Sequence, residues 1–339
     1  AMLLVSHDLG VIGHCCQQVA VMYNGEKLLE APCQQVLTNP GHPYAEALLQ
    51  ATPRIKPVVK NMAQETDATP ALTLRDLALC YRTPGWFSRR FGQETPLTVE
   101  GVSLDLAQGE TVGLVGESGS GKSTILKAIA GLLPPVSGQI VLGRDGDLPP
   151  LVRQRSHDHL RRVQMIFQNA DLALNPRQTV AEILAQPLRL YFSMTGAQIR
   201  QRGAELLDQV RLPAAYLDKL PGQLSGGEKQ RVAIARAFAA EPEIVLCDEI
   251  TSALDVSVQA TVLELLQDLK RERGTSYIFV SHDLAVVQAL SDKVMVLQHG
   301  RVCEAGRVAD VYGDPQHSYT RKLFDAVLEP FTNATGVTV

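Results

Sequence analysis

The sequence predicts an α/β fold built around a glycine-rich loop that joins a buried strand to a helix. An apolar run at 110–116 is typical of a short buried strand, and a glycine-rich stretch follows it directly. Isoleucine and leucine then recur at helical spacing through 125–133, before Pro134 and Pro135, which we expect to end the helix. A second apolar run at 244–247 leads into two acidic residues. This order of strand, loop, helix and acidic strand end predicts a P-loop NTPase.

The glycine-rich stretch fits the P-loop pattern GxxxxGK[ST]. It comprises Gly116, Glu117, Ser118, Gly119, Ser120, Gly121, Lys122 and Ser123, and Thr124 follows it. Glycine lets phosphate oxygens approach the backbone N–H groups closely, and the next helix directs the positive end of its dipole at the anion. The Lys122 ammonium is expected to bind the β- and γ-phosphates, and the Ser123 hydroxyl is expected to coordinate Mg²⁺. The sequence therefore predicts ATP and Mg²⁺ as ligands and disfavours a chance glycine-rich turn.

A second pair of glycines lies where another helix is expected to begin. Ser225 and Glu228 have the spacing of a capping box, which places Gly226 and Gly227 in the first turn. Backbone N–H groups exposed there, at the positive end of a helix dipole, predict a second anion site. The stretch LSGGEKQR at 224–231 resembles the signature sequence of ATP-binding-cassette (ABC) ATPases.

This resemblance implies an α/β P-loop NTPase fold of the ABC ATPase type. Such a domain has a RecA-like parallel-sheet core, an antiparallel β subdomain and a helical subdomain. By the same resemblance, Asp248 is the aspartate linked to Mg²⁺, and Glu249 polarises or positions the attacking water. Ser252, Ala253, Leu254 and Asp255 are expected to form the loop that crosses a dimer interface.

Three more residues receive roles from the family resemblance. Gln168, between the P-loop and the signature, is expected to contact Mg²⁺ at the switch between subdomains. His282, after an apolar strand, is expected to hydrogen-bond the γ-phosphate and hold Glu249 and the water. Tyr81 resembles the aromatic residue that stacks on adenine, although an aromatic residue near a strand end is more often part of a core.

In ABC ATPases the P-loop of one domain faces the signature of another, with ATP between them. The resemblance therefore implies that Ser225 and Gly227 serve the nucleotide of a partner. We expect weak activity unless two chains dimerise, because half a site leaves the γ-phosphate without its second set of donors.

An internal repeat indicates how the chain is organised. LVSHDL at 4–9 matches FVSHDL at 279–284, and the two histidines are 275 positions apart (282 − 7). NPGHPY at 39–44 matches DPQHSY at 314–319 at the same offset. From the dipeptide Glu-Ala at 30 and 304, we expect the register to slip by one there and then recover.

The repeat predicts four segments. Residues 1–57 are interpreted as the C-terminal remnant of a first ABC ATPase domain and 58–70 as a linker. A complete domain is expected at 71–312, with its helical subdomain at about 178–222, followed by a tail at 313–339. On this interpretation about 200 residues of the first copy precede residue 1. The alternative is a shorter protein with an N-terminal extension.

The repeated motif NPGHPY at 39–44 and the segment FQNADLALNPRQTV at 167–180 resemble the oligopeptide, dipeptide and nickel branch of ABC importers. The second copy of the motif, DPQHSY at 314–319, departs mildly, because Ser318 stands where the first copy has Pro43. This resemblance implies a subunit that hydrolyses ATP to power import of di- or oligopeptides, glutathione or nickel. The implied partners are two transmembrane permease subunits, a second ABC ATPase domain and, indirectly, a periplasmic or extracellular solute-binding protein. No cysteine follows Cys303, so no iron–sulfur centre is expected.

Composition bears on the other function classes. The net charge is −4, which disfavours a broad basic face for nucleic acid. No apolar run reaches the ~18 residues of a membrane-spanning helix, and the N-terminus does not resemble a secretory signal. We therefore expect a peripheral protein at the cytoplasmic face of the plasma (inner) membrane.

Two alternative functions remain. One is a tandem ABC ATPase acting on ribosomes or DNA, which the short mixed-charge linker disfavours, and the other is a non-hydrolysing nucleotide binder. The basic, aromatic stretch at 85–93 is interpreted as an exposed loop.

Overall fold

The computed structural model describes residues 2–6, 8–56, 70–81, 97–252 and 254–327. Within these residues the strands form a six-stranded, a three-stranded and a two-stranded sheet. No helix in this part of the chain is long and apolar enough to cross a membrane.

The six-stranded sheet has the order β11-β10-β5-β9-β8-β7. Its strands are β5 (Thr111–Val115), β7 (Val163–Ile166), β8 (Ile244–Asp248), β9 (Ser276–Val280), β10 (Lys293–Gln298) and β11 (Arg301–Arg307). All neighbouring pairs are parallel except β10 and β11. The three-stranded sheet is antiparallel and contains β3 (Leu72–Leu79), β4 (Val99–Leu106) and β6 (Ser137–Leu142). The predicted parallel core and antiparallel β subdomain are therefore confirmed.

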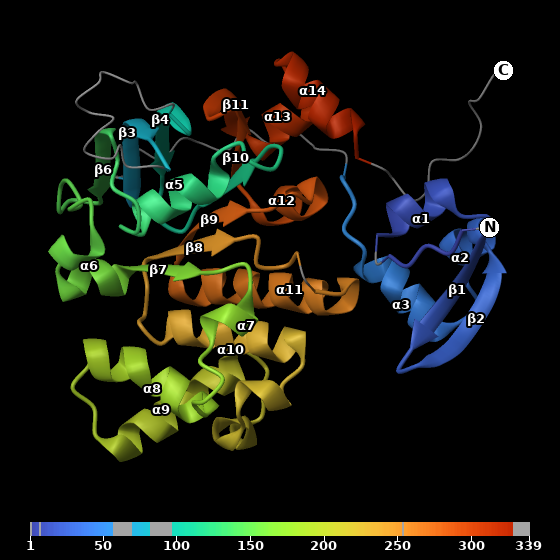
Figure 1. Cartoon of the computed structure of the whole chain (residues 1–339), viewed down its shortest axis with the longest axis horizontal. Helices are drawn as coiled ribbons and strands as arrows, with labels where there is room; N and C mark the ends of the chain where they lie inside the picture. Colours follow the sequence, from blue (N-terminus) through green and yellow to red (C-terminus); the bar gives the residue numbers. More distant parts are fainter. Residues whose placement is uncertain (1, 7, 57–69, 82–96, 253, 328–339) are drawn as a thin grey trace, which may run out of the picture.

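Helices cover both faces of the large sheet. They are α5 (Lys122–Ile129), α6 (His157–Arg162), α7 (Ala170–Ala173), α8 (Val180–Tyr191), α9 (Gly196–Gln209), α10 (Gly226–Phe238), α11 (Val256–Arg273), α12 (Leu284–Leu290), α13 (Val308–Gly313) and α14 (Ser318–Asp325). Short 3₁₀ turns lie at Val152–Gln154, Ala214–Asp218 and Pro221–Gln223. Figure 1 shows α5 on one side of the sheet and α10 and α11 on the other, with α8 and α9 beyond α10.

The inner strands β5, β8 and β9 are buried along their whole length, on both faces of the sheet. In β8, Ile244 and Leu246 belong to the hydrophobic cluster around α5. Val245 and Cys247 belong to the cluster around α10 and α11. Successive side chains of a strand point to opposite faces, so one continuous apolar run serves two cores.

The apolar stripes of α8 and α9 form core rather than surface, with one exception. Their buried members are Ile183, Leu184, Leu188, Leu206, Leu207 and Val210. Ala181 is partly buried against them. Leu190, which shares the pattern, is 51% exposed.

The helix after the P-loop ends earlier than the sequence predicts. It ends at Ile129, not at the prolines, because Gly131 takes the left-handed conformation with φ 75°. The Leu132 N–H then donates to the Lys127 carbonyl at 2.8 Å, which satisfies the last turn. The expectation failed because a glycine signal at the helix end outweighs apolar spacing in the next residues.

The repeat is present in three dimensions. The first copy contains α1 (Leu9–Cys15), β1 (Gln18–Tyr23), β2 (Glu26–Pro32), α2 (Cys33–Thr38) and α3 (Pro43–Ala51). Each begins 275 residues before its counterpart among α12, β10, β11, α13 and α14. The predicted register slip is wrong. Both hairpins carry their irregularity at the same place, after Val21 and Val296, so the Glu-Ala coincidence has no structural meaning.

The two copies differ in what covers them. Met2, Leu3 and Val5 are 78%, 93% and 90% exposed. Their counterparts in the second copy lie in β9, which is fully buried between β5 and β8. Within the described residues, no strand lies beside 2–5, so Met2, Leu3 and Val5 stay exposed while only Leu4 packs against the small cluster around Leu9.

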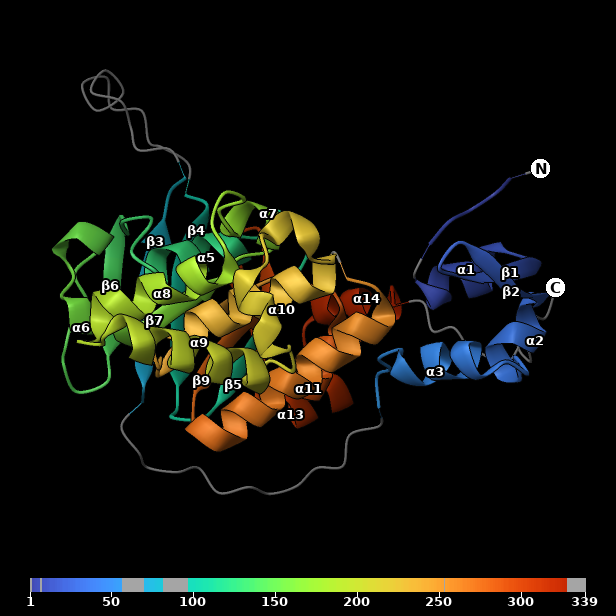
Figure 2. The same cartoon turned by 90° about the horizontal axis from the view of Figure 1, so that it is seen from below.

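The first copy rests against the second along α11. Helix α3 contacts α11, and Figure 2 shows the two helices meeting at one side of the larger body. Gln288 of α12 both donates to the Lys56 carbonyl at 2.8 Å and accepts from the Lys56 N–H at 2.7 Å.

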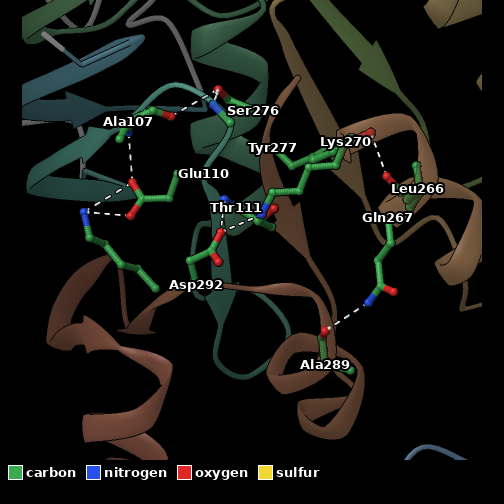
Figure 3. Close-up of polar contacts among 12 residues, drawn as sticks. Ala107, Glu110, Thr111, Leu266, Gln267, Lys270, Ser276, Tyr277, Ala289 and Asp292 are labelled. Atoms are coloured by element: carbon green, nitrogen blue, oxygen red, sulfur yellow. Dashed lines mark hydrogen bonds and ion pairs between the residues drawn. The ribbon is translucent and has the colours of Figure 1, made fainter. Parts of the chain in front are cut away.

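A polar network holds the amino ends of the central strands (Figure 3). Asp292 accepts from the Thr111 N–H at 2.8 Å and from the Lys270 ammonium at 2.6 Å. Glu110 pairs with Lys293 at 2.9 Å. The network leaves the carboxyl ends of the same strands free for ligands, as is usual in open α/β sheets.

Candidate nucleotide-binding site

The P-loop connects β5 to α5 through backbone that requires glycine. Gly116 has φ 142°, and a Cβ there would lie 2.1 Å from the Leu297 carbonyl oxygen. Gly121 has φ 104°, and a Cβ there would lie 2.6 Å from a methyl group of Val99. Side chains are therefore excluded at both ends of the loop, where its backbone passes close to neighbouring strands.

Lys122 is the first residue of α5, and its side chain turns back into this loop. It is only 5% exposed, and its ammonium donates to the Gly116 carbonyl at 2.7 Å and the Glu117 carbonyl at 2.8 Å. Burial lowers the pKa of Lys122, while the nearby charges of Glu249 and Asp248 act in the opposite direction. The loop thus holds a positive charge beside the backbone of Glu117, Ser118 and Gly119, all of which are exposed.

The end of β8 meets the start of α5 in a group of oxygen atoms. The Ser123 hydroxyl donates to Asp248 Oδ1 at 2.7 Å, and Asp248 is 8% exposed. Burial raises the pKa of Asp248, while the bond from Ser123 lowers it. A hydroxyl and a carboxylate side by side are the oxygen ligands that Mg²⁺ prefers, so the predicted pair fits that ion.

Glu249 lies next to two other residues predicted from the sequence. Its Oε2 accepts from Gln168 Nε2 at 2.9 Å and lies 3.7 Å from His282 Nδ1. Its backbone is left-handed, with φ 49°, and its N–H donates to the Val280 carbonyl at 3.0 Å. Such conformations cost about 1–3 kcal/mol for a residue other than glycine and cluster at functional sites.

The predicted interface loop follows this cluster. Asp255 caps α11 and accepts from the Val258 N–H at 3.0 Å. Ala253 lies outside the described residues. A cavity of about 500 Å³ opens beside His282, and Asp8 and Leu9 of the first copy line its other side.

Tyr81 lies two residues after the end of β3 and is 63% exposed. The ammonium of Lys127 lies 5.4 Å from the ring centroid. The ring is thus available for stacking, and the alternative that it is a core residue is wrong. The basic stretch at 85–93 and nearly all of the predicted linker at 58–70 lie outside the described residues.

The signature helix begins as predicted. Ser225 is the N-cap of α10, where its N–H donates to Glu228 Oε2 at 2.7 Å and its hydroxyl accepts from the Glu228 N–H at 3.3 Å. The two glycines differ, however. A Cβ at Gly226 would meet nothing within 4 Å, whereas one at Gly227 would lie 2.3 Å from Val258 Cγ1. Gly226 is open to a ligand, and Gly227 allows α10 to approach α11 closely.

This difference predicts different effects on stability. Gly227→Ala should lower the free energy of unfolding by about 1–3 kcal/mol, because Val258 is β-branched and cannot turn away inside a helix. Gly226→Ala, its matched control, should leave stability unchanged or slightly raised, since alanine favours a helix. Thermal unfolding of the two variants checks this. Equal melting temperatures would contradict the packing role of Gly227.

Sequence reasoning missed one residue that contacts the site. Tyr319 of α14 is 6% exposed, and its hydroxyl accepts from the Glu117 N–H of the P-loop at 3.0 Å. The available signal was the repeated motif His-Pro-Tyr at 42–44 and His-Ser-Tyr at 317–319, which we used only to identify a branch of the family.

Comparisons with known proteins agree with this geometry. Residues 99–252 match the family model "ABC transporter", and residues 30–76 and 303–338 match the model "Oligopeptide/dipeptide transporter, C-terminal region". The second model matches both ends of the chain, as the repeat predicts.

Relatives and solved structures give the same result. The chain is 37% identical over 348 residues to the glutathione import ATP-binding protein of Escherichia coli K12, covering 96% of the chain and 55% of that protein. The corresponding protein of Pectobacterium atrosepticum is also 37% identical, with 56% of it covered. The chain thus spans little more than half the length of these relatives.

Among solved structures, the chain is similar to cbiO1 of Clostridium perfringens, part of the ABC transporter complex cbiONQ. The TM-score is 0.62 at 25% identity, covering 73% of this chain and 92% of that one. It is also similar to the ATP-binding cassette MJ0796 in a dimeric post-hydrolysis state with ADP and Pi. Here the TM-score is 0.59 at 30% identity, covering 70% of this chain and 98% of that one. The chain therefore belongs to the ABC transporter family and contains its ATP-binding cassette.

Proposed function

We propose that this chain binds ATP with Mg²⁺ and hydrolyses it to power an importer of glutathione, peptides or a related small solute. The observation that carries the proposal is the cluster around Glu249. Gln168 and His282 lie 2.9 and 3.7 Å from its carboxylate. In the neighbouring P-loop, Lys122 is bonded to the Gly116 carbonyl and Ser123 to Asp248.

The residues of the site fit the Mg²⁺ complex of ATP. Ser123 and Asp248 would supply oxygen ligands. Gln168 donates its amide N–H to Glu249, and its side-chain oxygen would be a third ligand. Bound Mg²⁺ would neutralise charge on the β- and γ-phosphates. Lys122 places its positive charge on the same phosphates, and the exposed ring of Tyr81 offers a surface for adenine.

Hydrolysis requires a group that positions water and accepts its proton. The water oxygen bonds to the γ-phosphorus as the bond from that phosphorus to the β–γ bridging oxygen breaks, which leaves ADP and phosphate. The carboxylate of Glu249 is the proton acceptor in this proposal. Gln168 donates to one oxygen of this carboxylate and His282 lies 3.7 Å from the same oxygen, so both restrict its orientation and most of the catalytic effect comes from positioning.

A second cassette would complete the site. Gly226 is open to solvent at the start of α10, where it can receive the nucleotide bound to a partner's P-loop. The MJ0796 cassette, which the chain covers almost completely, is dimeric with ADP and Pi. We infer that Ser225, Gly226 and Gly227 act in trans and that Asp255 lies at the same interface.

Dimerisation predicts complementation between two inactive variants. Lys122→Ala removes the P-loop charge, and Gly226→Asp puts a negative charge in the open space where phosphates would approach. Each variant alone should hydrolyse ATP poorly. A mixture should recover part of the wild-type rate, because a mixed pair contains one intact site.

The wild-type rate per chain should also rise with protein concentration. Steady-state phosphate release at several concentrations and mixing ratios measures both effects. A rate per chain that is independent of concentration, together with an inactive mixture, would show that one chain suffices.

The transport proposal rests on the two matches to the oligopeptide/dipeptide transporter C-terminal region and on the glutathione import relatives. It implies two permease subunits, a second ATPase domain and a solute-binding protein, with this chain peripheral at the cytoplasmic face of the inner membrane. The segment 1–57 is proposed to be the end of a first cassette, as its matching elements indicate.

Uptake of labelled glutathione and dipeptides by cells that carry the permease genes, with and without this protein, tests transport. Co-purification with permease subunits supports it. Co-sedimentation with ribosomes instead would contradict it.

A further inference from the structure

The C-terminal tail contacts the P-loop through one buried hydroxyl group. Tyr319 lies in α14, 202 positions after Glu117, and accepts a hydrogen bond from the Glu117 N–H at 3.0 Å. Its ring is 6% exposed, so the hydroxyl is presented to the loop from a fixed, packed side chain. The tail is thus in direct contact with the phosphate-binding backbone.

The contact fixes one particular peptide group. The Gly116 carbonyl and the Glu117 N–H belong to the same planar unit. Lys122 donates to the carbonyl at 2.7 Å from one side, and Tyr319 accepts from the N–H at 3.0 Å on the other. Because the unit turns as a whole, Tyr319 determines the direction of the carbonyl that holds the Lys122 ammonium.

This peptide needs an external anchor. It follows Gly116, a residue whose backbone is intrinsically permissive and whose φ is 142°. Glu117 is exposed, and the Tyr319 hydroxyl is the one acceptor that the structure gives its N–H among the described residues. Without the hydroxyl, the plane would be restrained mainly by Lys122 itself, the side chain that must act on phosphate.

The tyrosine is itself well supported. The Glu304 carboxylate of β11 accepts from the Gln316 N–H at 2.8 Å and the His317 N–H at 3.1 Å. His317 Nδ1 then accepts from the Tyr319 N–H at 3.1 Å. Hydrogen bonds to a charged carboxylate are stronger than neutral ones, so the turn before α14 is held firmly on the sheet.

We propose that Tyr319 is a positioning residue for nucleotide binding, which orients the Gly116–Glu117 peptide and, through it, the Lys122 ammonium. This inference rests on the proposed ATP binding. It gives the tail a role in the affinity of the cassette for nucleotide, and it makes the tail's docking on β11 a determinant of that affinity.

Tyr319→Phe removes the hydroxyl and keeps the ring. The dissociation constant for a fluorescent (methylanthraniloyl) ATP should rise about threefold to tenfold, the range of one lost hydrogen bond. The KM for ATP should rise with it, while kcat at saturating ATP stays close to wild type. Hydrogen–deuterium exchange of the peptide spanning 114–121 should become faster, because the Glu117 N–H loses its acceptor.

The matched control is Tyr277→Phe. Its hydroxyl also makes a hydrogen bond to the backbone, but it donates to the Leu266 carbonyl at 3.2 Å and lies near the start of β9, away from the P-loop (Figure 3). It should lower the melting temperature without changing nucleotide affinity or exchange at 114–121. If Tyr319→Phe does not fold, Glu304→Gln weakens the turn that holds Tyr319 in place. The dissociation constant for the fluorescent ATP should then rise by a smaller factor.

The outcomes separate the two proposals. Wild-type protein that does not bind the fluorescent ATP contradicts the proposed function. Wild-type binding with an unchanged dissociation constant in Tyr319→Phe, or an equal loss in Tyr277→Phe, contradicts the positioning role of Tyr319 alone.

Discussion

Replacing Glu249 with glutamine is expected to stop ATP hydrolysis and leave ATP bound. Glutamine keeps the length of the side chain and can still accept a hydrogen bond from Gln168, which lies 2.9 Å from the carboxylate, beside His282 at 3.7 Å. It cannot accept a proton from water. A positioned general base contributes about 10²–10⁴-fold to rate, so kcat should fall by at least about 100-fold.

The backbone at this position strengthens the expectation. Glu249 is left-handed, with φ 49°, and its N–H is bonded to the Val280 carbonyl of the neighbouring strand. The structure therefore fixes where the side chain begins, and an amide placed there occupies the position of the carboxylate. Nucleotide affinity should stay within about twofold of wild type, because the substitution leaves the P-loop groups that would contact ATP unchanged.

Single-turnover cleavage of radiolabelled ATP and equilibrium binding measure the two effects separately. Glu272→Gln, an exposed change near the end of α11, is the matched control and should alter neither. Normal turnover in the Glu249 variant would remove this residue from the proposed role. A loss of binding equal to the loss of turnover would instead show that Glu249 holds the nucleotide.

The parts of the site that follow short-range rules were predictable from the sequence. The P-loop glycines at 116 and 121 have the backbone that their pattern implies, and the box of Ser225 and Glu228 caps its helix. The glycine requirement depends on φ at one residue, and the capping box depends on two residues three positions apart. The local sequence is therefore enough to predict both features. The fold class followed because these local units occur in the order that a parallel sheet requires.

Predictions that depended on contacts between distant segments were less complete. Gly227 is next to Val258 only because α10 packs on α11, and Tyr319 reaches Glu117 only because the tail docks on β11. The expected register slip failed for a related reason. The dipeptide Glu-Ala occurs by chance at 30 and 304, and we interpreted it as part of the repeat. The strand pairing of both hairpins instead keeps the same offset throughout.

Lys122→Ala is expected to weaken ATP binding by about 10- to 100-fold, which corresponds to the loss of one or two hydrogen bonds to a charged group. The ammonium is buried at 5% exposure and is the cation that the loop places beside its own backbone. Burial lowers the pKa of Lys122, so desolvation disfavours its charged form, and Glu249 and Asp248 offset part of this effect. A bound phosphate group would offset more of it.

Truncation to alanine also removes the donors to the Gly116 and Glu117 carbonyls, so loop order and charge change together. Lys122→Met separates them, because it keeps the buried stem and removes only the ammonium. If charge dominates, methionine and alanine should weaken binding to a similar extent. If packing dominates, methionine should retain most of the affinity.

Titration with the same fluorescent ATP, with and without Mg²⁺, measures these affinities. Lys322→Ala provides a control of equal net charge on the exposed side of α14 and should bind as wild type does. An affinity in Lys122→Met equal to wild type would show that this ammonium does not contact the phosphates. The buried charge would then serve only to close the loop, and the nucleotide would have to bind through the backbone N–H groups alone.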